Sequence, residues 1–269
     1  MPSPLTASFR QLHRGAQPLR LPNAWDAGSA RLFESLGAPA IATTSAGVAW
    51  ALGYPDGGKL PADAAVAVVA NIARVLRVPL SVDVEHGYSD DPTAVAGLVQ
   101  QLLDLGVAGI NIEDGSRAPE LLARKIEAIK NIAAKSGADI FVNARTDVFL
   151  AGLVEAPRRV EETLARGKLY QNAGADGLFV PALSEPAQIR AVVNGIGLPL
   201  NVLAWPGLPP ADQLGELGVH RLSAGSGIAQ VLWGQARKLA QDFLESGHSE
   251  PMGESSMPYP QLQSLFMER

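Results

Sequence analysis

The chain contains no cysteine among its 269 residues. Disulfides, thiolate metal sites and a cysteine nucleophile are therefore excluded together. A basic excess is also missing, because 22 lysines and arginines stand against 27 aspartates and glutamates, for a formal net charge of -5. A nucleic-acid partner requires basic residues that neutralise phosphates, so we expect none.

Long apolar runs are absent as well. No stretch reaches the length of about eighteen apolar residues that a membrane helix needs, and the first residues lack the charged-then-apolar pattern of a signal peptide. We therefore expect a cytoplasmic protein without a membrane segment. The four histidines lack metal-ligand spacing, and no Ser-His-Asp arrangement or nucleophile elbow is visible, which disfavours hydrolysis by a triad.

Short β-rich runs alternate with helical patterns eight times along the chain, which predicts βαβ units around a parallel sheet. This rhythm favours an α/β fold, a (β/α)₈ barrel of the TIM type over residues 1–247, with a doubly wound sheet as the alternative. Against the alternative, no Gly-x-Gly-x-x-Gly follows the first strand. The predicted strands are 19–22, 39–43, 79–84, 108–112, 139–144, 176–180, 198–203 and 219–224, and the last helix spans 228–244.

A tail over residues 248–269 follows the predicted barrel. It begins rich in proline, serine and glutamate, and its end, 259–267, is apolar again. An apolar segment beyond the last barrel helix needs a surface on which to pack. We expect an extra C-terminal segment that packs either on a neighbouring subunit, making a homo-oligomer, or on its own barrel.

Three apolar runs end in charged residues about thirty residues apart, at 82–87, 110–114 and 142–147. The carboxyl ends of barrel strands meet at one face, so Asp83, Glu85 and Glu113 would converge there. Buried carboxylates repel one another unless a cation compensates them, and a divalent hard cation would do so. Glu113 is predicted to be a metal ligand, with an ion pair to Arg145 as the alternative.

Arg145 ends the fifth strand beside this acidic cluster, where a guanidinium can bind a substrate carboxylate or phosphate through two hydrogen bonds. Asp147 is expected to orient Arg145 or to cap the next turn. Asp114 is expected to bond loop backbone, and His86 to be a loop residue.

Loops near the same face offer further groups. The loop at Thr44, Ser45 and Gly47 carries hydroxyls and backbone amides suited to a substrate anion. Asp56 lies in a glycine-rich segment that predicts either a mobile flap or ordinary turns. The segment Gly225–Gly227 after the eighth strand predicts a tight turn into a helix, with a phosphate cradle as the alternative.

Several of these motifs resemble the isocitrate lyase and phosphoenolpyruvate mutase superfamily. The resemblance extends from residue 21 through the eighth strand, and the most specific motifs are Thr44-Ser45-Ala46-Gly47-Val48-Ala49, Asp83-x-Glu85-x-Gly87-Tyr88, Ile112-Glu113-Asp114 and Ala144-Arg145-Thr146-Asp147. It implies a barrel, chemistry next to a 2-oxo acid, and a homotetramer that exchanges a C-terminal helix.

The same resemblance implies roles for single residues. Asp83 would bind Mg²⁺ directly, or Mn²⁺ in its place, while Asp56, Glu85 and Glu113 would hold its waters. Thr44, Ser45, the amide of Gly47 and Asn201 would contact the substrate. Arg145 and Asp56 are the expected catalytic residues.

The chain also departs from the superfamily pattern. The lyases carry a cysteine-containing loop soon after the Glu-Asp motif, whereas here residues 115–120 lead directly into a helix. Alanine at 182 stands where the lyases carry a glutamate. We therefore expect a Mg²⁺-dependent lyase of a small 2-oxo or 2-hydroxy dicarboxylate, with oxaloacetate decarboxylation the simplest case. The alternatives are a phosphonomutase or phosphonopyruvate hydrolase, and a non-catalytic 2-oxo acid binding protein.

Overall fold

The computed structural model describes residues 3–254 and 256–267. Nine parallel strands form one sheet in the order β1-β9-β8-β7-β6-β5-β4-β3-β2, which curls into a nearly closed barrel. The predicted (β/α)₈ barrel is confirmed. The strands are β1 (Leu19–Leu21), β2 (Asn23–Ala24), β3 (Ile41–Thr43), β4 (Leu80–Asp83), β5 (Gly109–Glu113), β6 (Phe141–Arg145), β7 (Gly177–Phe179), β8 (Leu200–Leu203) and β9 (Arg221–Ser223).

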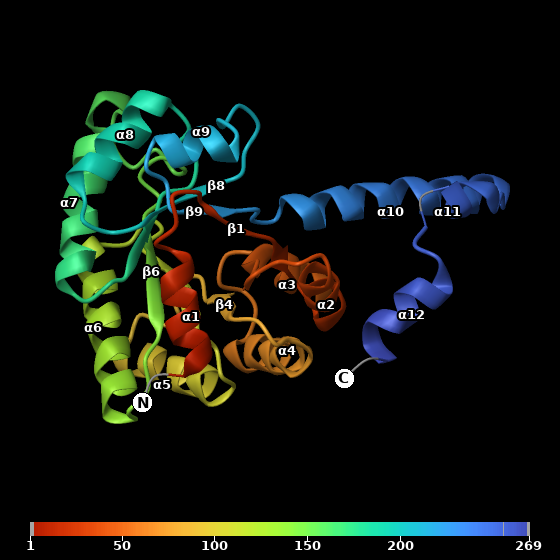
Figure 1. Ribbon diagram of the computed structural model, residues 1–269, viewed down its shortest axis with the longest axis horizontal. Helices are drawn as coiled ribbons and strands as arrows, with labels where there is room; N and C mark the ends of the chain where they lie inside the picture. Colours follow the sequence, from red (N-terminus) through yellow and green to blue (C-terminus); the bar gives the residue numbers. More distant parts are fainter. Residues whose placement is uncertain (1–2, 255, 268–269) are drawn as a thin grey trace.

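Helices surround the sheet, as Figure 1 shows. The helix that follows β4 is capped by Asp91, whose side chain accepts a hydrogen bond from the amide of Thr93 at 2.9 Å. The helices that follow strands are α2 (Ala27–Ser35), α4 (Ala62–Val75), α5 (Pro92–Asp104), α6 (Pro119–Lys135), α7 (Arg159–Asn172) with η1 (Ala156–Arg158) before it, α8 (Pro186–Gly195), α9 (Ala211–Glu216) and α10 (Gly227–Ser246).

The first repeat differs from its prediction of one strand over residues 19–22, because a second short strand follows Pro22. The segment before this residue pairs with β9 and the segment after it pairs with β3. Proline has no amide hydrogen to donate, but its carbonyl still accepts from the amide of Ala42 at 3.2 Å. The two short strands therefore join the two edges of the sheet.

The amino-terminal helix α1 (Pro4–Leu12) was not predicted, and it closes one end of the barrel. Phe9 is fully buried among residues that begin the strands, including Leu19, Ala40 and Phe141. Its ring meets Phe141 edge-on, with 5.5 Å between the ring centroids. This apolar plug fills the amino-terminal end, so a functional site is left to the opposite end of the strands.

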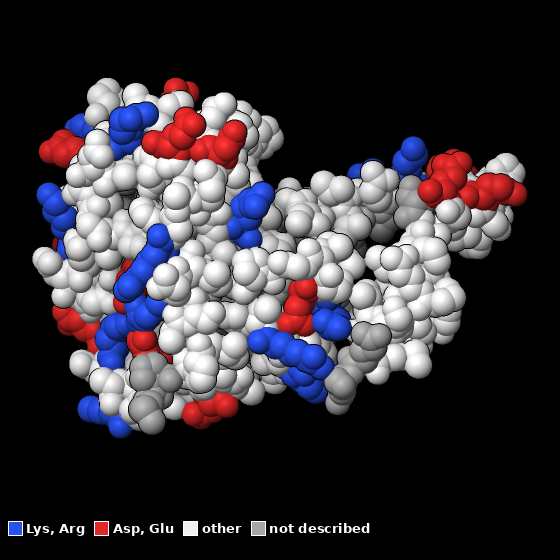
Figure 2. Space-filling view, in the orientation of Figure 1, with Lys and Arg blue, Asp and Glu red and all other residues white. Residues whose placement is uncertain are grey.

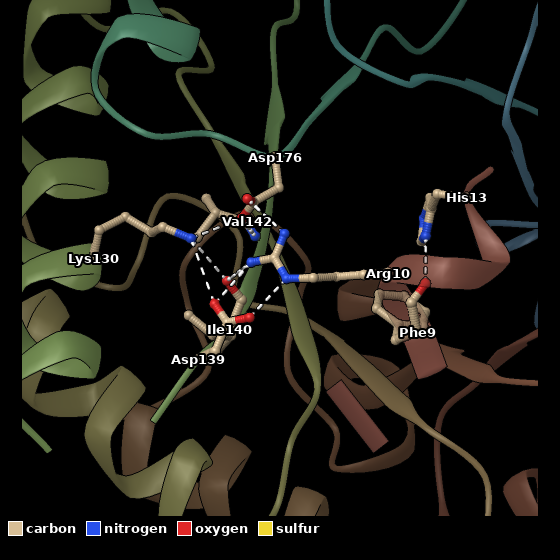
Figure 3. Close-up of polar contacts among 8 residues, drawn as sticks. All are labelled: Phe9, Arg10, His13, Lys130, Asp139, Ile140, Val142 and Asp176. Atoms are coloured by element: carbon tan, nitrogen blue, oxygen red, sulfur yellow. Dashed lines mark hydrogen bonds and ion pairs between the residues drawn. The ribbon is translucent and has the colours of Figure 1, made fainter. Parts of the chain in front are cut away.

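An ion-pair network fastens α1 to the barrel (Figure 3). Arg10 donates from Nε and Nη2 to both oxygens of Asp139, at 2.7 and 2.8 Å, and from Nη1 to Asp176 at 2.7 Å. Lys130 on α6 reaches the other oxygen of Asp176 at 2.9 Å. Because these groups are only partly exposed, the network ties helix and strand ends together more firmly than an isolated surface pair would.

His13, just after α1, makes the stability of the fold depend on pH. Its ring stacks on Phe141 with 4.3 Å between centroids, and burial, together with the charge of Arg221, lowers its pKa to about 3. An unfolded histidine has a pKa of about 6.5, so between these values the unfolded state binds the extra proton and stability falls as the pH falls.

We expect His13→Phe to remove this sensitivity while it keeps an aromatic ring in the plug. When the pH is lowered from 7 to 4.5, the free energy of unfolding, measured with urea, should fall by about 2 to 3 kcal/mol less in the variant than in the unchanged protein. An equal pH dependence in the two proteins would mean that His13 already carries its proton in the fold.

The C-terminal part projects from the barrel as an arm, defined here as residues 227–267 without 255 (Figure 1). Ala229 alone among the residues of α10 is buried, and Gly247 ends this helix with a φ of 68°. Helices α11 (Glu250–Glu254) and α12 (Tyr259–Met267) follow, and α12 returns to the barrel, where Arg31 on α2 donates to the carbonyl of Leu265 at 2.8 Å. No helix in the described ranges is long and apolar enough to span a bilayer.

Candidate active site at the carboxyl ends of the strands

A cavity of about 190 Å³ opens at the carboxyl ends of the barrel strands. Five of its lining residues come from the predicted site, namely Asp83 and Arg145 at strand ends, Thr44 and Ser45 just after β3, and Asp56 on a loop. The other described residues of its wall are Asn23, Ala46, Asn111, Leu150, Phe179, Pro181, Leu203, Trp205, Ser223, Gly225 and Ser226.

Asp83 ends β4 and is held by its neighbours on both sides. Its backbone amide donates to the hydroxyl of Thr43 at 2.8 Å, and its Oδ1 accepts from the amide of Glu85 at 3.0 Å. Glu85 adopts a left-handed backbone with a φ of 51°, as does Tyr88 with 56°. Such conformations are costly for residues other than glycine and persist mainly where the surroundings enforce them, often at functional sites.

This turn changes one expectation about the strand. Asp83 and Glu85 were expected to converge at the strand ends, but β4 ends at Asp83 and the chain turns sharply at Glu85. The Glu85 side chain is buried and does not line the cavity. It nevertheless stays within electrostatic reach of Asp83 and Asp56.

Glu85, Glu113 and Asp83 hold their protons more firmly than isolated carboxyl groups do. Burial, with the charges of Asp56 and Asp83, raises the pKa of Glu85 to about 7. Burial raises the pKa of Glu113 to about 8, although Arg145 opposes the shift. Burial also raises the pKa of Asp83, with Asp56 adding to the effect. Negative charge is thus in excess, and a bound cation would relieve it.

The carboxylates around Asp83 fit Mg²⁺ better than they fit zinc or calcium. Among the described ranges, no three histidine, aspartate or glutamate side chains lie close enough to ligate one ion together. Zinc and calcium sites usually need several protein ligands, whereas Mg²⁺ keeps most of its waters and takes one or two carboxylates. Asp83 as the direct ligand, with neighbouring carboxylates around the waters, suits Mg²⁺.

Arg145 ends β6 beside these acids. Asp147 accepts from Nε at 2.7 Å and from Nη2 at 3.1 Å, so its expected role in orienting Arg145 is confirmed. Nη1 lies 2.8 Å from a carboxylate oxygen of Glu113. The guanidinium also lies 5.9 Å from the centroid of the Phe179 ring. A partly buried guanidinium fixed in this way can orient a substrate carboxylate without first reorganising.

Asp114 fixes the loop that follows β6. One of its oxygens accepts from the hydroxyls of Thr146 and Tyr170, at 2.8 and 2.6 Å, and from Arg166 at 2.9 Å, while the other accepts from the amide of Asp147 at 3.0 Å. The expected bond from Asp114 to loop backbone is confirmed. The side chain faces away from the cavity and holds Asp147, which in turn holds Arg145.

The predicted loop at residues 44–47 is wrong in its local structure, because it begins the short helix α3 (Ser45–Ala51). Thr44 is its cap, and the Gly47 amide, expected to bind substrate, donates to the Thr44 hydroxyl at 3.4 Å. Gly47 does not line the cavity. A Cβ on this glycine would lie 2.7 Å from the methyl group of Thr44, so close packing explains the residue.

Asn201 also lies behind the cavity wall. Its side chain is buried and donates to the hydroxyl of Ser223 at 3.1 Å, and Ser223 lines the cavity. His86 does not line it either, and its carbonyl accepts from Lys125 at 2.9 Å. The Gly225–Gly227 segment is the turn into α10, and the Gly225 amide donates to Asn23 at 2.9 Å.

Sequence analysis missed several polar residues of the floor. Asn111 lies two residues before Glu113 on β5, so alternation could have placed both on the inner face. Arg221 is fully buried and donates to Asn111 at 3.2 Å and to Ser223 at 3.1 Å. Burial lowers the pKa of Arg221 to about 9, which the charge of Asp83 opposes. No local signal could reveal this contact across the barrel.

Comparison with known proteins gives a consistent result. Residues 9–244 match the sequence profile of the family described as phosphoenolpyruvate phosphomutase. An uncharacterized protein of Mycobacterium tuberculosis is 40% identical over 265 residues, which cover 97% of this chain and 96% of that protein. The 2-methylisocitrate lyase of Escherichia coli is 29% identical over 205 residues, covering 72% of this chain and 67% of the lyase.

Two further proteins extend the comparison. The oxaloacetate decarboxylase of Pseudomonas fluorescens is 28% identical over 239 residues, covering 84% of this chain and 80% of the decarboxylase. A crystal structure from Burkholderia cenocepacia, provisionally assigned as a phosphonomutase, is 40% identical and has a TM-score of 0.84. That likeness covers 89% of this chain and 100% of the other.

Proposed function

The chain belongs to the phosphoenolpyruvate phosphomutase family, and we propose that it is a Mg²⁺-dependent lyase of a small 2-oxo or 2-hydroxy dicarboxylate. It is an enzyme of a superfamily whose members cleave or rearrange C–C or C–P bonds. The observation that carries the proposal is that Asp83, Asp56, Ser45 and Arg145 line one cavity. The relatives named as a methylisocitrate lyase and an oxaloacetate decarboxylase support it.

Asp83 would hold the metal ion, with Asp56, Glu85 and Glu113 around its waters, and Mn²⁺ could replace Mg²⁺. The raised pKa values of Glu85 and Glu113 support this assignment, because burial and the neighbouring carboxylates leave negative charge that Arg145 alone does not offset. When bound, the ion would neutralise the negative charge that develops on the 2-oxo oxygen.

The chain's own residues bind and orient the substrate. Ser45 and Thr44 line the cavity on one side and would donate to the carboxylate next to the 2-oxo group. Arg145 would hold the second carboxylate, and Asp147 keeps its guanidinium in position. Asp56 lies on the exposed glycine-rich loop, where it could act once that loop covers the substrate.

Oxaloacetate decarboxylation needs no more groups than these. The bond between C3 and the departing carboxylate breaks, its electron pair moves toward the 2-oxo oxygen, CO₂ leaves, and C3 takes a proton from water. This route fits a chain without cysteine, which lacks the acid of the superfamily lyases. Arg145, by holding the departing carboxylate in one orientation, would lower the entropy cost of the step.

A phosphonomutase or phosphonopyruvate hydrolase is the second candidate. It is favoured by the likeness to the Burkholderia cenocepacia protein and by Gly225 and Ser226, which line the cavity just before α10. Turnover distinguishes the candidates. Oxaloacetate, 2-methylisocitrate, isocitrate and phosphonopyruvate would each be supplied with Mg²⁺ and with chelator, while pyruvate, glyoxylate and phosphate are measured.

Chelator-sensitive release of pyruvate from oxaloacetate or another C–C substrate would support the lyase, and phosphate release from phosphonopyruvate would support the second candidate. If no compound is turned over but 2-oxo acids still bind, both enzymatic candidates would be overturned in favour of a binding protein.

We propose further that the arm joins subunits into a homotetramer by packing on a second copy. Helix α10 presents Trp233, Phe243 and Leu244 to solvent, with exposed fractions of 54%, 50% and 82%. Figure 2 shows the arm between the barrel and its tip as mostly uncharged. Surfaces of this kind are rarely left uncovered in a single folded chain.

Removal of residues 258–269 should weaken assembly, because α12 takes exposed apolar side chains such as Phe266 and Leu262 with it. Light scattering should then give a smaller mass than the full chain. Leu244→Lys should act in the same direction, whereas Glu245→Lys, one residue further on, serves as its control. Identical masses for all four proteins would refute the assembly role.

A further inference from the structure

One side-chain amide in the cavity is free to bind a ligand. Asn23 and Asn111 both line the cavity. Asn23 uses both ends of its amide, because Oδ1 accepts from the Gly225 amide at 2.9 Å and Nδ2 donates to the Thr43 carbonyl at 2.7 Å. In the part of the chain that the structure describes, Nδ2 of Asn111 has no hydrogen-bond partner, yet it is not one of the unpartnered polar atoms that are sealed from solvent. This nitrogen therefore faces the cavity.

Arg221 on β9 and Asn143 on β6 fix the orientation of this amide. The Asn111 Oδ1 atom accepts from Nη2 of Arg221 at 3.2 Å and from Nδ2 of Asn143 at 2.9 Å. A guanidinium can only donate, so the atom that faces Arg221 must be the amide oxygen. Rotating the amide by half a turn would set N–H groups against each other and leave buried donors unpaired. Because the oxygen is held on this side, the nitrogen is held on the side of the cavity.

Strand pairing places this donor beside Asp83. Asp83 on β4 and Asn111 on β5 are partners in the parallel register, and both line the cavity. Neighbouring strands lie about 5 Å apart, so a substrate oxygen in front of Asp83 is within hydrogen-bond reach of Nδ2. Ser45 and Arg145 are already assigned to the two carboxylates of the substrate. The 2-oxo oxygen is then the acceptor that still lacks a donor from the chain.

We propose that Asn111 is a catalytic residue whose Nδ2 donates to the 2-oxo oxygen of the substrate, with Arg221 as the positioning residue that holds the amide. The inference rests on the proposed function and adds a donor to it. As the bond between C3 and the departing carboxylate breaks, the electron pair moves toward that oxygen, and Asn111 keeps its proton while its hydrogen bond strengthens. Because Arg221 fixes the amide beforehand, no reorganisation of the donor opposes the step.

Nuclear magnetic resonance of the full chain tests the contact directly. Selective ¹⁵N labelling of asparagine makes the side-chain amides visible, and the Asn111 signal is the one that disappears in Asn111→Asp. The probe is oxalate with Mg²⁺, because oxalate carries a charged oxygen next to a carboxylate, as the substrate does after the bond breaks. We expect oxalate to move one Nδ2 proton of Asn111 downfield, further than it moves the side-chain amide of any other asparagine. A purely structural Asn111, bonded only to Arg221 and Asn143, would keep its signal in place.

Calorimetric titrations with Mg²⁺ present give the strength of the contact. Asn111→Ala should bind oxalate about tenfold more weakly than the unchanged protein, but pyruvate only about threefold more weakly. The reason is that a hydrogen bond to a charged oxygen is about twice as strong as one to a neutral oxygen. Asn131→Ala on the exposed face of α6 is the control for loss of an asparagine as such, and it should bind both compounds normally.

Arg221→Met tests the positioning role. The variant leaves Asn111 in place but frees its amide to rotate, so oxalate binding should weaken about threefold or more while pyruvate binding stays nearly unchanged. Arg221→Lys should recover most of the oxalate affinity, because an ammonium group also only donates and keeps Oδ1 of Asn111 turned toward it. A merely structural Arg221 would change the melting temperature without separating oxalate from pyruvate.

The outcomes separate this inference from the proposed function. If oxalate binds with Mg²⁺, an unmoved Asn111 signal or an unchanged affinity in Asn111→Ala would overturn the role of Asn111 and leave the lyase. If oxalate does not bind although chelator-sensitive pyruvate release occurs, kcat of Asn111→Ala decides. A fall of about tenfold or more at nearly unchanged KM supports the inference, and an unchanged kcat overturns it. If neither binding nor turnover occurs with Mg²⁺, both proposals fail.

Discussion

Asp83→Asn should lose turnover by about 10²- to 10³-fold or more while the barrel stays folded, because the change removes the proposed direct metal ligand without altering its shape. The amide keeps an oxygen that can accept from the Glu85 amide, as Asp83 does at 3.0 Å, so the turn after β4 should survive. Steady-state kinetics at saturating Mg²⁺, with circular dichroism for the fold, measure the two effects.

Asp90→Asn is the matched control for this variant. Asp90 lies seven residues further along the same chain segment, is exposed, and pairs with Arg117 at 2.9 Å. Its loss should leave kcat and the metal dependence unchanged. Full activity in Asp83→Asn, with unaltered dependence on Mg²⁺, would remove Asp83 from the mechanism.

Arg145→Met should lower kcat/KM by two orders of magnitude or more, and it should also lower thermal stability. The substitution removes the group proposed to orient the second carboxylate, and it leaves Asp147 and Glu113 in a partly buried site without their cation. Breaking a buried pair from one side costs about 3 to 5 kcal/mol, so the melting temperature should fall measurably.

Arg145→Lys separates charge from geometry. A lysine keeps the positive charge but cannot bind both oxygens of Asp147 through a planar fork, so it should recover stability more fully than activity. Arg124→Met on the exposed face of α6 is the control for loss of an arginine as such. Equal kcat/KM in Arg145→Met and the unchanged enzyme would exclude a role for Arg145 in orientation.

The architecture could be predicted because each repeat carries its own local signals. The third repeat is an example, since the apolar run before Asp83 and the cap at Asp91 each follow from neighbouring residues. Helix α3 was missed because its seven residues are too few to show a helical repeat of apolar positions. Thr44 was also interpreted as a loop hydroxyl and not as a helix cap. The role of α1 was missed because Phe9 and Arg10 act through Phe141 and Asp139, which are distant in sequence.

The charged ends of strands were predictable for a different reason. Asp83, Glu113 and Arg145 interrupt apolar runs, and parallel strands bring such ends to one face whatever the connecting loops do. Positions whose role depends on distant partners were not predictable. Arg221 reaches Asn111 across the barrel, and Phe179 and Leu203 line one cavity only because β7 and β8 pair.

The most direct test of a metal and 2-oxo acid site at Asp83 is anomalous diffraction from crystals grown with Mn²⁺ and pyruvate. We predict one strong Mn²⁺ peak beside the Asp83 carboxylate, with the pyruvate carboxylate next to Ser45 and its methyl group toward Phe179. A fully occupied Mn²⁺ peak elsewhere, with none beside Asp83, would contradict the proposed site and the mechanism that depends on it.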